Sequence, residues 1–128
     1  MSTPPIVRKK ILIADDDKSV AECMEILLGL SGYDVLVAFD GQEAVKKARS
    51  VVPDLILMDM VMPKLSGFDA CKIIKKDPAL RHIPVIALTS LSQMGDIEKA
   101  YTAGADDYQH KPFDNAHLLE KVEKYLEG

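Results

Sequence analysis

The chain has no tryptophan, few other aromatic residues and no long apolar stretch. Phenylalanine and tyrosine together make up 5% of its 128 residues, and no apolar run approaches the ~20 residues of a membrane-spanning helix. We therefore expect no membrane segment. Basic residues are in deficit, since 16 lysines and arginines face 20 aspartates and glutamates. Domains that bind nucleic acid carry a basic surface instead, so we also expect no direct nucleic-acid partner.

Cysteine is scarce as well. The two cysteines, Cys23 and Cys71, fall within helical patterns and lack the close spacing of a metal or redox motif. We expect both to be reduced thiols in the core, which is typical of a cytoplasmic protein. Residues 1–5 lack the apolar core of a secretory signal. The sequence thus predicts a disordered tail over residues 1–7 and a single globular domain over residues 8–127.

Three consecutive aspartates follow an apolar run near the start of this domain. Residues 10–14 have the composition of a strand buried on both faces, and Asp15, Asp16 and Asp17 come directly after them. Like charges at the end of a buried strand repel one another and resist desolvation, whereas Mg²⁺ binds through carboxylate oxygens. A solvated turn that caps the next helix explains the same residues. Both interpretations are open at this point.

Apolar runs and amphipathic stretches alternate five times along the chain. The pattern predicts strands over residues 10–14, 34–38, 54–58, 84–88 and 107–110, and helices over residues 19–31, 41–50, 67–76, 93–103 and 114–126. Five strand–helix units imply a parallel sheet with helices on both faces. The first, third and fourth strands are almost continuously apolar, so we place them in the centre of the sheet and the other two at its edges.

Polar side chains stand where the predicted strands end. Asp15 and Asp16 follow the first strand, Asp59 the third, Thr89 the fourth and Lys111 the fifth. Ligands of open parallel sheets bind outside the carboxyl ends of the strands, so we expect these side chains to converge. Each one alone has an ordinary explanation as a helix cap, a turn residue or a surface lysine. Their coincidence at four strand ends favours a common functional site.

Four stretches of the chain together carry a family resemblance: residues 11–16, 54–67 (DLILMDMVMPKLSG), 83–90 (IPVIALTS) and 103–113 (AGADDYQHKPF). The chain resembles, over about residues 8–126, the receiver domain of two-component response regulators, of the single-domain type found in chemotaxis. The resemblance implies a flavodoxin-like (βα)5 fold, a doubly wound parallel sheet with strand order 2-1-3-4-5. It also implies a phosphoacceptor signalling domain that assists its own phosphorylation and dephosphorylation, rather than an enzyme.

The resemblance implies roles for the acidic residues in phosphorylation and Mg²⁺ binding. Asp59 is the carboxylate that accepts a phosphoryl group from a phosphohistidine. Asp16 and Asp59 bind Mg²⁺ directly, Asp15 acts through a metal-bound water, and Val61 supplies its backbone carbonyl. Carboxylates are known nucleophiles in aspartyl-phosphate chemistry, which agrees with this assignment.

Three further residues complete the implied mechanism. Lys111 pairs with Asp59 and then with a phosphoryl oxygen, the Thr89 hydroxyl binds another phosphoryl oxygen, and Tyr108 is an aromatic rotamer switch. When Thr89 moves, Tyr108 gains space to turn inward. We therefore expect a two-state surface formed by the fourth helix, the fifth strand and the fifth helix. A cis peptide bond between Lys111 and Pro112 is a further expectation from the family.

The implied partners follow from the same resemblance. A sensor histidine kinase or a histidine phosphotransfer protein is the expected phosphodonor, and a downstream target protein is the expected receptor of the signal. The chain is expected to be a monomer or a weak, phosphorylation-dependent dimer in the cytoplasm. A stand-alone receiver is the favoured interpretation, and a fragment of a longer regulator is the alternative.

Three rival interpretations agree less well with the sequence. A phosphohydrolase of the haloacid dehalogenase type needs a second aspartate two residues after the nucleophile, where this chain has Val61. A dinucleotide-binding domain needs a glycine-rich turn where the aspartates stand. A pseudo-receiver that acts only as a scaffold usually lacks one of the phosphorylation residues, and none is missing here.

The apolar Val61 side chain cannot orient a hydrolytic water, so we hypothesise moderate to slow self-dephosphorylation.

Overall fold

Residues 8–90 and 94–127 are described by the computed structural model of the chain. Within them the chain forms five strands, β1 (Lys10–Ala14), β2 (Asp34–Ala38), β3 (Leu55–Asp59), β4 (Val85–Thr89) and β5 (Asp107–His110). They alternate with five helices, α1 (Lys18–Leu30), α2 (Gly41–Val51), α3 (Gly67–Lys76), α4 (Met94–Thr102) and α5 (Asn115–Glu127). The tail predicted over residues 1–7 lies outside the described residues, and so does Gln93, the predicted start of the fourth helix.

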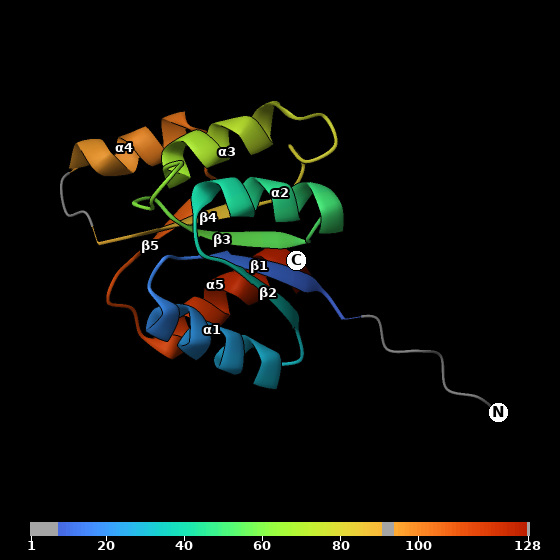
Figure 1. Ribbon diagram of the computed structural model, residues 1–128. Helices are drawn as coiled ribbons and strands as arrows, with labels where there is room; N and C mark the ends of the chain where they lie inside the picture. Colours follow the sequence, from blue (N-terminus) through green and yellow to red (C-terminus); the bar gives the residue numbers. More distant parts are fainter. Residues whose placement is uncertain (1–7, 91–93, 128) are drawn as a thin grey trace.

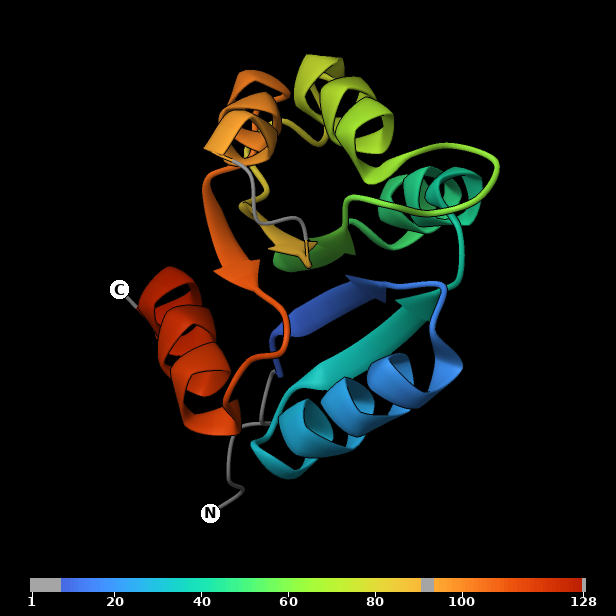
Figure 2. The same ribbon diagram turned by 90° about the vertical axis from the view of Figure 1, so that its left-hand side faces the viewer.

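The strands form one parallel sheet in the order β2-β1-β3-β4-β5, which confirms the expected doubly wound topology. Helices α2, α3 and α4 cover one face of the sheet and α1 and α5 cover the other (Figure 1). Figure 2 shows the same two helical layers after a quarter turn. The chain reverses its winding direction between β1 and β3. Ligand sites of such sheets lie at this reversal, outside the carboxyl ends of the strands.

The burial of the strands explains their places in the sheet. Every residue of β3 and β4 is buried, and so is every residue of β1 after Lys10, whereas most of β2 and β5 is partly exposed. Successive side chains of a strand point to opposite faces, so Leu12 and Ile56 pack toward α2 and α3, and Ile11 and Leu55 toward α1 and α5. The predicted central and edge strands are therefore confirmed.

The boundaries of β3 and β4 differ from their predictions in one informative respect. The sequence pattern ends these strands at Met58 and Leu88, whereas the structure ends them at Asp59 and Thr89. Asp59 still pairs with Leu88, and Thr89 pairs with His110. The first polar residue after each apolar run thus remains in the hydrogen-bonded ladder. Regular strand backbone, which is more rigid than a loop, therefore positions both side chains.

Short polar side chains begin the helices, as expected. Asp17 accepts hydrogen bonds from the backbone N–H groups of Ser19 and Val20, at 3.0 and 3.2 Å, at the start of α1. Asp114 does the same for Ala116 and His117, at 2.7 and 3.3 Å, at the start of α5. These bonds satisfy backbone donors that have no partner within the helix.

Over the described residues, no helix has the length and apolar content needed to cross a membrane.

The prediction for the cysteines is half wrong. Both are free thiols, but only Cys71 is buried, and Cys23 is exposed on α1. The residues that α1 buries are Ala21, Met24 and Leu28, and Cys23 lies about 100° around the helix from its neighbour Met24. Helical periodicity alone places the buried stripe only to within about one residue, which explains the error. Burial raises the pKa of the Cys71 thiol to about 11.

Candidate functional site

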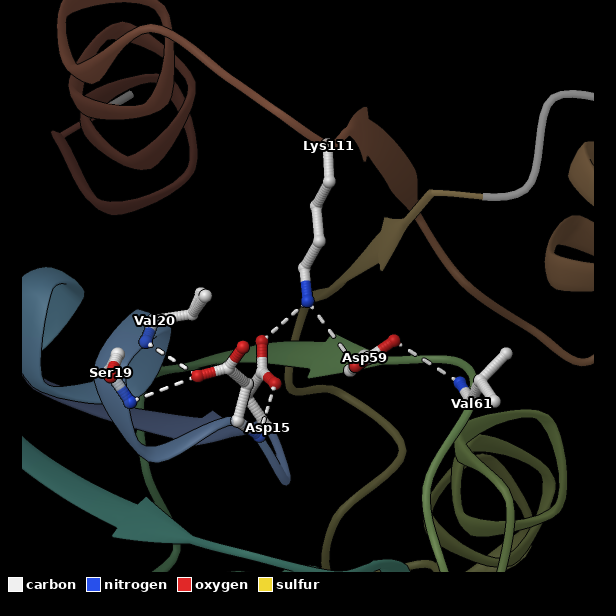
Figure 3. Close-up of polar contacts among 7 residues, drawn as sticks. Asp15, Ser19, Val20, Asp59, Val61 and Lys111 are labelled. Carbon is white, nitrogen blue, oxygen red and sulfur yellow. Dashed lines mark hydrogen bonds and ion pairs between the residues drawn. The ribbon is translucent and has the colours of Figure 1, made fainter.

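The carboxyl ends of three strands bring two carboxylates and an ammonium group together (Figure 3). Asp15 follows β1 and is 0% exposed, and Asp59 is the last residue of β3 and is 8% exposed. The Lys111 side chain extends from the end of β5 toward both of them. The predicted convergence of these residues is therefore observed.

Lys111 is bound more closely by Asp15 than by Asp59. Its Nζ donates to Asp15 Oδ2 at 2.6 Å and to Asp59 Oδ2 at 3.2 Å. Burial acts against the charge of the ammonium, but the hydrogen bond to Asp15 and the negative charges of both aspartates outweigh it and raise the pKa of Lys111. Lys111 is therefore protonated at neutral pH. The sequence predicts a pair between Lys111 and Asp59 alone, whereas the assembled sheet also brings Lys111 to Asp15.

Asp16 adds a third carboxylate to this group. One oxygen of each of Asp15, Asp16 and Asp59 lies within 4.8 Å of the others, and Asp16 is exposed to solvent. Three carboxylates beside one ammonium leave an excess of negative charge that a divalent cation can neutralise. Carboxylate oxygens are the protein ligands that Mg²⁺ prefers. The donor set at this edge of the sheet therefore fits a magnesium ion that is reached from solvent on the Asp16 side.

The Asp59 carboxyl group has a raised pKa, mainly because it is buried. The Val61 N–H, which donates to Asp59 Oδ1 at 3.2 Å, and the charge of Lys111 oppose this shift, and the charge of Asp15 adds to it. An acid with a raised pKa contributes stability below its unfolded pKa, and this contribution is lost as pH rises through the folded value. Ionised Asp59 is therefore a cost to the folded chain at neutral pH, and a bound cation would reduce that cost.

The aspartate triplet divides between the two interpretations. Asp17 caps α1, and its own N–H donates to Asp15 Oδ1 at 3.0 Å. Asp15 and Asp16 belong to the acidic cluster. The cap therefore holds the turn that positions Asp15, so the capping interpretation is confirmed for Asp17, and the metal interpretation stays a prediction for Asp15 and Asp16.

Gly67 sets the path of the loop that follows Asp59. The Gly67 N–H donates to the Met60 carbonyl at 3.0 Å, which brings the start of α3 against the end of β3. A Cβ atom at Gly67 would overlap the carbonyl oxygen of Asp59 and lie 2.7 Å from the Met60 Cα. Real Cβ atoms do not approach backbone atoms so closely. The residue at this position must therefore lack a side chain for Asp59 to keep its place.

Thr89 and Tyr108 lie on neighbouring strands beside the cluster. Thr89 is 3% exposed, and its carbonyl accepts a hydrogen bond from the Lys111 N–H at 2.8 Å. The half-buried Tyr108 ring meets Tyr101 of α4 edge to face, with centroids 6.1 Å apart, and lies 5.5 Å from Lys121 Nζ of α5. Sequence reasoning missed Tyr101 and Lys121, because only the packing of α4 and α5 against β5 brings them to Tyr108. The Lys111–Pro112 bond is cis, as expected.

Comparisons with known proteins agree on one family. The family model described as the response regulator receiver domain matches residues 11–123. RpaA of Synechocystis sp., a DNA-binding dual master transcriptional regulator, is 40% identical over 117 residues, which are 91% of this chain and 48% of RpaA. PhoP of Bacillus subtilis, a transcriptional regulatory protein for alkaline phosphatase synthesis, is 38% identical over 120 residues, 94% of this chain and 49% of PhoP.

A solved structure with the same fold contains a metal ion. The receiver domain of the sensor histidine kinase PA1611 from Pseudomonas aeruginosa was crystallised with a magnesium ion coordinated in its active-site cleft. It is 34% identical to this chain, with a TM-score of 0.89, and the match covers 95% of this chain and 100% of the other. The ion in that structure agrees with the fit of the donor set described above.

The prediction that this chain has no nucleic-acid partner is contradicted by the names of its relatives. RpaA is named as a DNA-binding protein, and this chain spans about half the length of the curated relatives it matches. The physical reason is that a net charge of −4 describes these 128 residues only. It carries no information on the other half of such a protein.

Proposed function

This chain belongs to the response regulator receiver family, and on that premise we propose that Asp59 accepts a phosphoryl group in a Mg²⁺-dependent transfer from a phosphohistidine of a kinase. One observation supports this most strongly. The buried Asp59 carboxylate shares the Lys111 ammonium with Asp15, at the sheet edge where Asp16 opens the cluster to solvent. Burying the charges of Asp15, Asp59 and Lys111 costs folding free energy. Their presence therefore favours a phosphorylated receiver over a scaffold that is never phosphorylated.

The residues that would hold Mg²⁺ are Asp16 and Asp59 directly, Asp15 through a water molecule, and Val61 through its backbone carbonyl. When bound, the ion supplies the positive charge that an anionic phosphodonor needs in order to approach three carboxylates. The solvent exposure of Asp16 supports entry of the ion from that side. The raised pKa of Asp59 supports a benefit from added positive charge.

Asp59 and Lys111 are the residues of this chain that act in the proposed transfer. An Asp59 carboxylate oxygen attacks phosphorus, a phosphorus–oxygen bond forms, and the phosphorus–nitrogen bond of the donor breaks. The donor imidazole keeps the electron pair of that bond and takes up a proton. Lys111 remains protonated because of its raised pKa. Its ammonium group can therefore pair first with the Asp59 carboxylate and then with a phosphoryl oxygen.

Acetyl phosphate is a suitable small phosphodonor for testing this transfer. We expect the intact mass of the chain to increase by one phosphoryl group in the presence of Mg²⁺ and acetyl phosphate, and not to increase when EDTA is present. The reason is that the ammonium of Lys111 alone cannot neutralise three carboxylates. Equal incorporation with and without EDTA would count against a metal-dependent reaction. No incorporation in either case would favour a scaffold without phosphorylation.

The Val61 side chain sets the expected lifetime of the phosphorylated state. Val61 is apolar and 58% exposed, and its own backbone N–H donates a hydrogen bond to Asp59 Oδ1. Since it cannot hold a hydrolytic water, the native aspartyl phosphate is expected to decay more slowly than that of Val61→Asn, whose amide can hydrogen-bond such a water. Loss of phosphoryl mass over time measures both rates. Faster decay of the native chain would contradict the hypothesis.

The switch is the second half of the proposed function. Thr89 and Tyr108 would respond to the phosphoryl group and change the surface formed by α4, β5 and α5. We expect beryllofluoride, a phosphoryl mimic, to shift the backbone amide signals of Thr89, Tyr108 and α4 in NMR spectra. The packing of Tyr108 against Tyr101 and Lys121 supports transmission to both helices. Shifts confined to Asp15, Asp16 and Asp59 would contradict the switch while leaving phosphoryl transfer intact.

A further inference from the structure

A groove of about 630 Å³ runs between α2 and α3, and none of its lining residues belongs to the acidic cluster. Its floor is apolar and consists of Val45 of α2, Leu65 of the loop before α3, and Ile73 of α3. Its α2 rim consists of Gln42, Lys46, Arg49 and Ser50. The site described above leaves this surface without a role.

The floor of the groove is held in place by a close backbone contact. A Cβ atom at Gly41, the first residue of α2, would overlap the carbonyl oxygen of Leu65. The absence of a side chain there lets the loop before α3 pass directly beside α2. Leu65 therefore lies partly buried against the core between the two helices, and its exposed part adds to the groove floor.

The rim of the groove has an excess of positive charge. The four rim residues of α2 recur at helical spacing and include two cations and no carboxylate. Lys46 has no hydrogen-bond or ion-pair partner among the described residues. Arg49 reaches Asp77 only through an exposed ion pair, with Nε 3.4 Å from the Asp77 carboxylate.

The α3 side does not cancel this charge. Helix α3 exposes Lys72 and Lys76 against Asp69, and Asp77 at its end is already paired with Arg49. The exposed charged residues of α2 and α3 are thus four cations and one carboxylate, and the partly buried Glu43 of α2 is paired with Lys47. The sign is opposite to that of the chain as a whole, whose net charge is −4.

We propose that this α2–α3 groove binds an acidic amphipathic segment of a partner protein, with apolar side chains on the floor and aspartates or glutamates at Lys46 and Arg49. Helix-in-groove recognition uses this combination of apolar anchors and a charged rim. A nucleic acid would match the charge but not the apolar floor. A second copy docked through the same face would bring Lys46 toward its own counterpart, because two-fold contacts pair a surface with itself. This inference does not depend on phosphorylation.

A designed peptide tests the proposal directly. The probe is a short helical peptide with leucines along one face and glutamates flanking them, titrated into the ¹⁵N-labelled full chain. We expect saturable amide shifts centred on residues 42–50, Leu65 and Ile73. Lys46→Glu should weaken binding ~10-fold through like-charge repulsion. The matched control Lys9→Glu, which reverses an exposed lysine before β1, should bind as the native chain does.

Three results would overturn the proposal. One is the absence of groove shifts at millimolar peptide. Another is equal binding by a peptide in which lysines replace the glutamates. The third is an oligonucleotide of equal charge that produces the same shifts with the same affinity, which would make the surface a general anion site. Since Lys46 makes no hydrogen bond or ion pair among the described residues, its charge reversal is expected to leave the fold intact, and Lys46→Gln provides a milder second variant.

Discussion

Lys111→Met is expected to lower the free energy of unfolding by about 2–3 kcal/mol and to slow phosphoryl incorporation at Asp59 about 100-fold. The substitution keeps most of the aliphatic stem but leaves Asp15, which is 0% exposed, without the ammonium that lies 2.6 Å from its Oδ2. Removing one partner of a fully buried ion pair costs about 3–5 kcal/mol. We expect a smaller loss of stability here because the Lys111 side chain is 17% exposed. Urea denaturation and intact mass measure the two effects.

The loss of stability should depend on pH in a defined direction. Because the pKa of Lys111 is raised in the folded chain, its contribution is fully present below the ordinary value of 10.5 and is lost as pH rises through the folded value. The native chain and Lys111→Met should therefore converge in stability at strongly alkaline pH. Lys64→Met is the control, since it removes an exposed lysine 3.5 Å from Asp40 and should cost less than about 1 kcal/mol. Equal losses of stability in the two variants would contradict this role of the Lys111–Asp15 ion pair.

Gly67→Ala is expected to destabilise the chain by about 3 kcal/mol, at the upper end of the range for overpacking. The new methyl group would meet the Asp59 carbonyl oxygen and the Met60 Cα, which are backbone atoms at the end of a buried strand and cannot move aside as a flexible side chain could. The strand end that carries Asp59 must then shift, so phosphoryl incorporation should slow as well. Thermal unfolding and intact mass report the two effects separately.

Gly29→Ala is the matched control for this prediction. Gly29 lies within α1, and a Cβ there meets nothing within 4 Å. Alanine in a helix interior is more favourable than glycine by up to about 1 kcal/mol, and because Gly29 lies in the last turn of α1 we expect a smaller gain in stability here. A Gly67→Ala variant as stable as the control, with unchanged phosphorylation, would show that the close approach to Asp59 is not required.

The sheet could be predicted from the sequence because buried parallel strands leave a strong apolar pattern. Residues 55–58 and 85–88 carry no polar side chain, and the structure places both segments in central strands. The same pattern could not show that Asp59 and Thr89 continue the ladder, since a polar residue at the end of an apolar run also marks the start of a loop. Nor could it place Cys23 outside the core, because that depends on the rotation of α1 by one residue.

The charged centre could be predicted only in part. The motif residues Asp15, Asp16, Asp59 and Lys111 stand at strand ends, and parallel pairing brings strand ends together. The sequence could not show that Lys111 binds Asp15 more closely than Asp59, because that depends on distances across three strands.

The contacts of α4 with β5, and of α2 with the loop before α3, could not be predicted from the sequence. Tyr101 reaches Tyr108 because α4 packs beside β5, and Leu65 reaches the α2–α3 groove because its loop passes directly beside Gly41. Neither depends on a local pattern of residues. Such features require the assembled fold.

The proposed role of Asp59 as the residue that carries the phosphoryl group can be tested with one substitution. The native chain and Asp59→Asn, incubated with Mg²⁺ and acetyl phosphate under identical conditions and compared by intact mass, test it most directly. We expect a gain of one phosphoryl group on the native chain and none on Asp59→Asn, with both chains folded by circular dichroism. An equal gain on the two chains, or no gain on the native chain, would contradict this role.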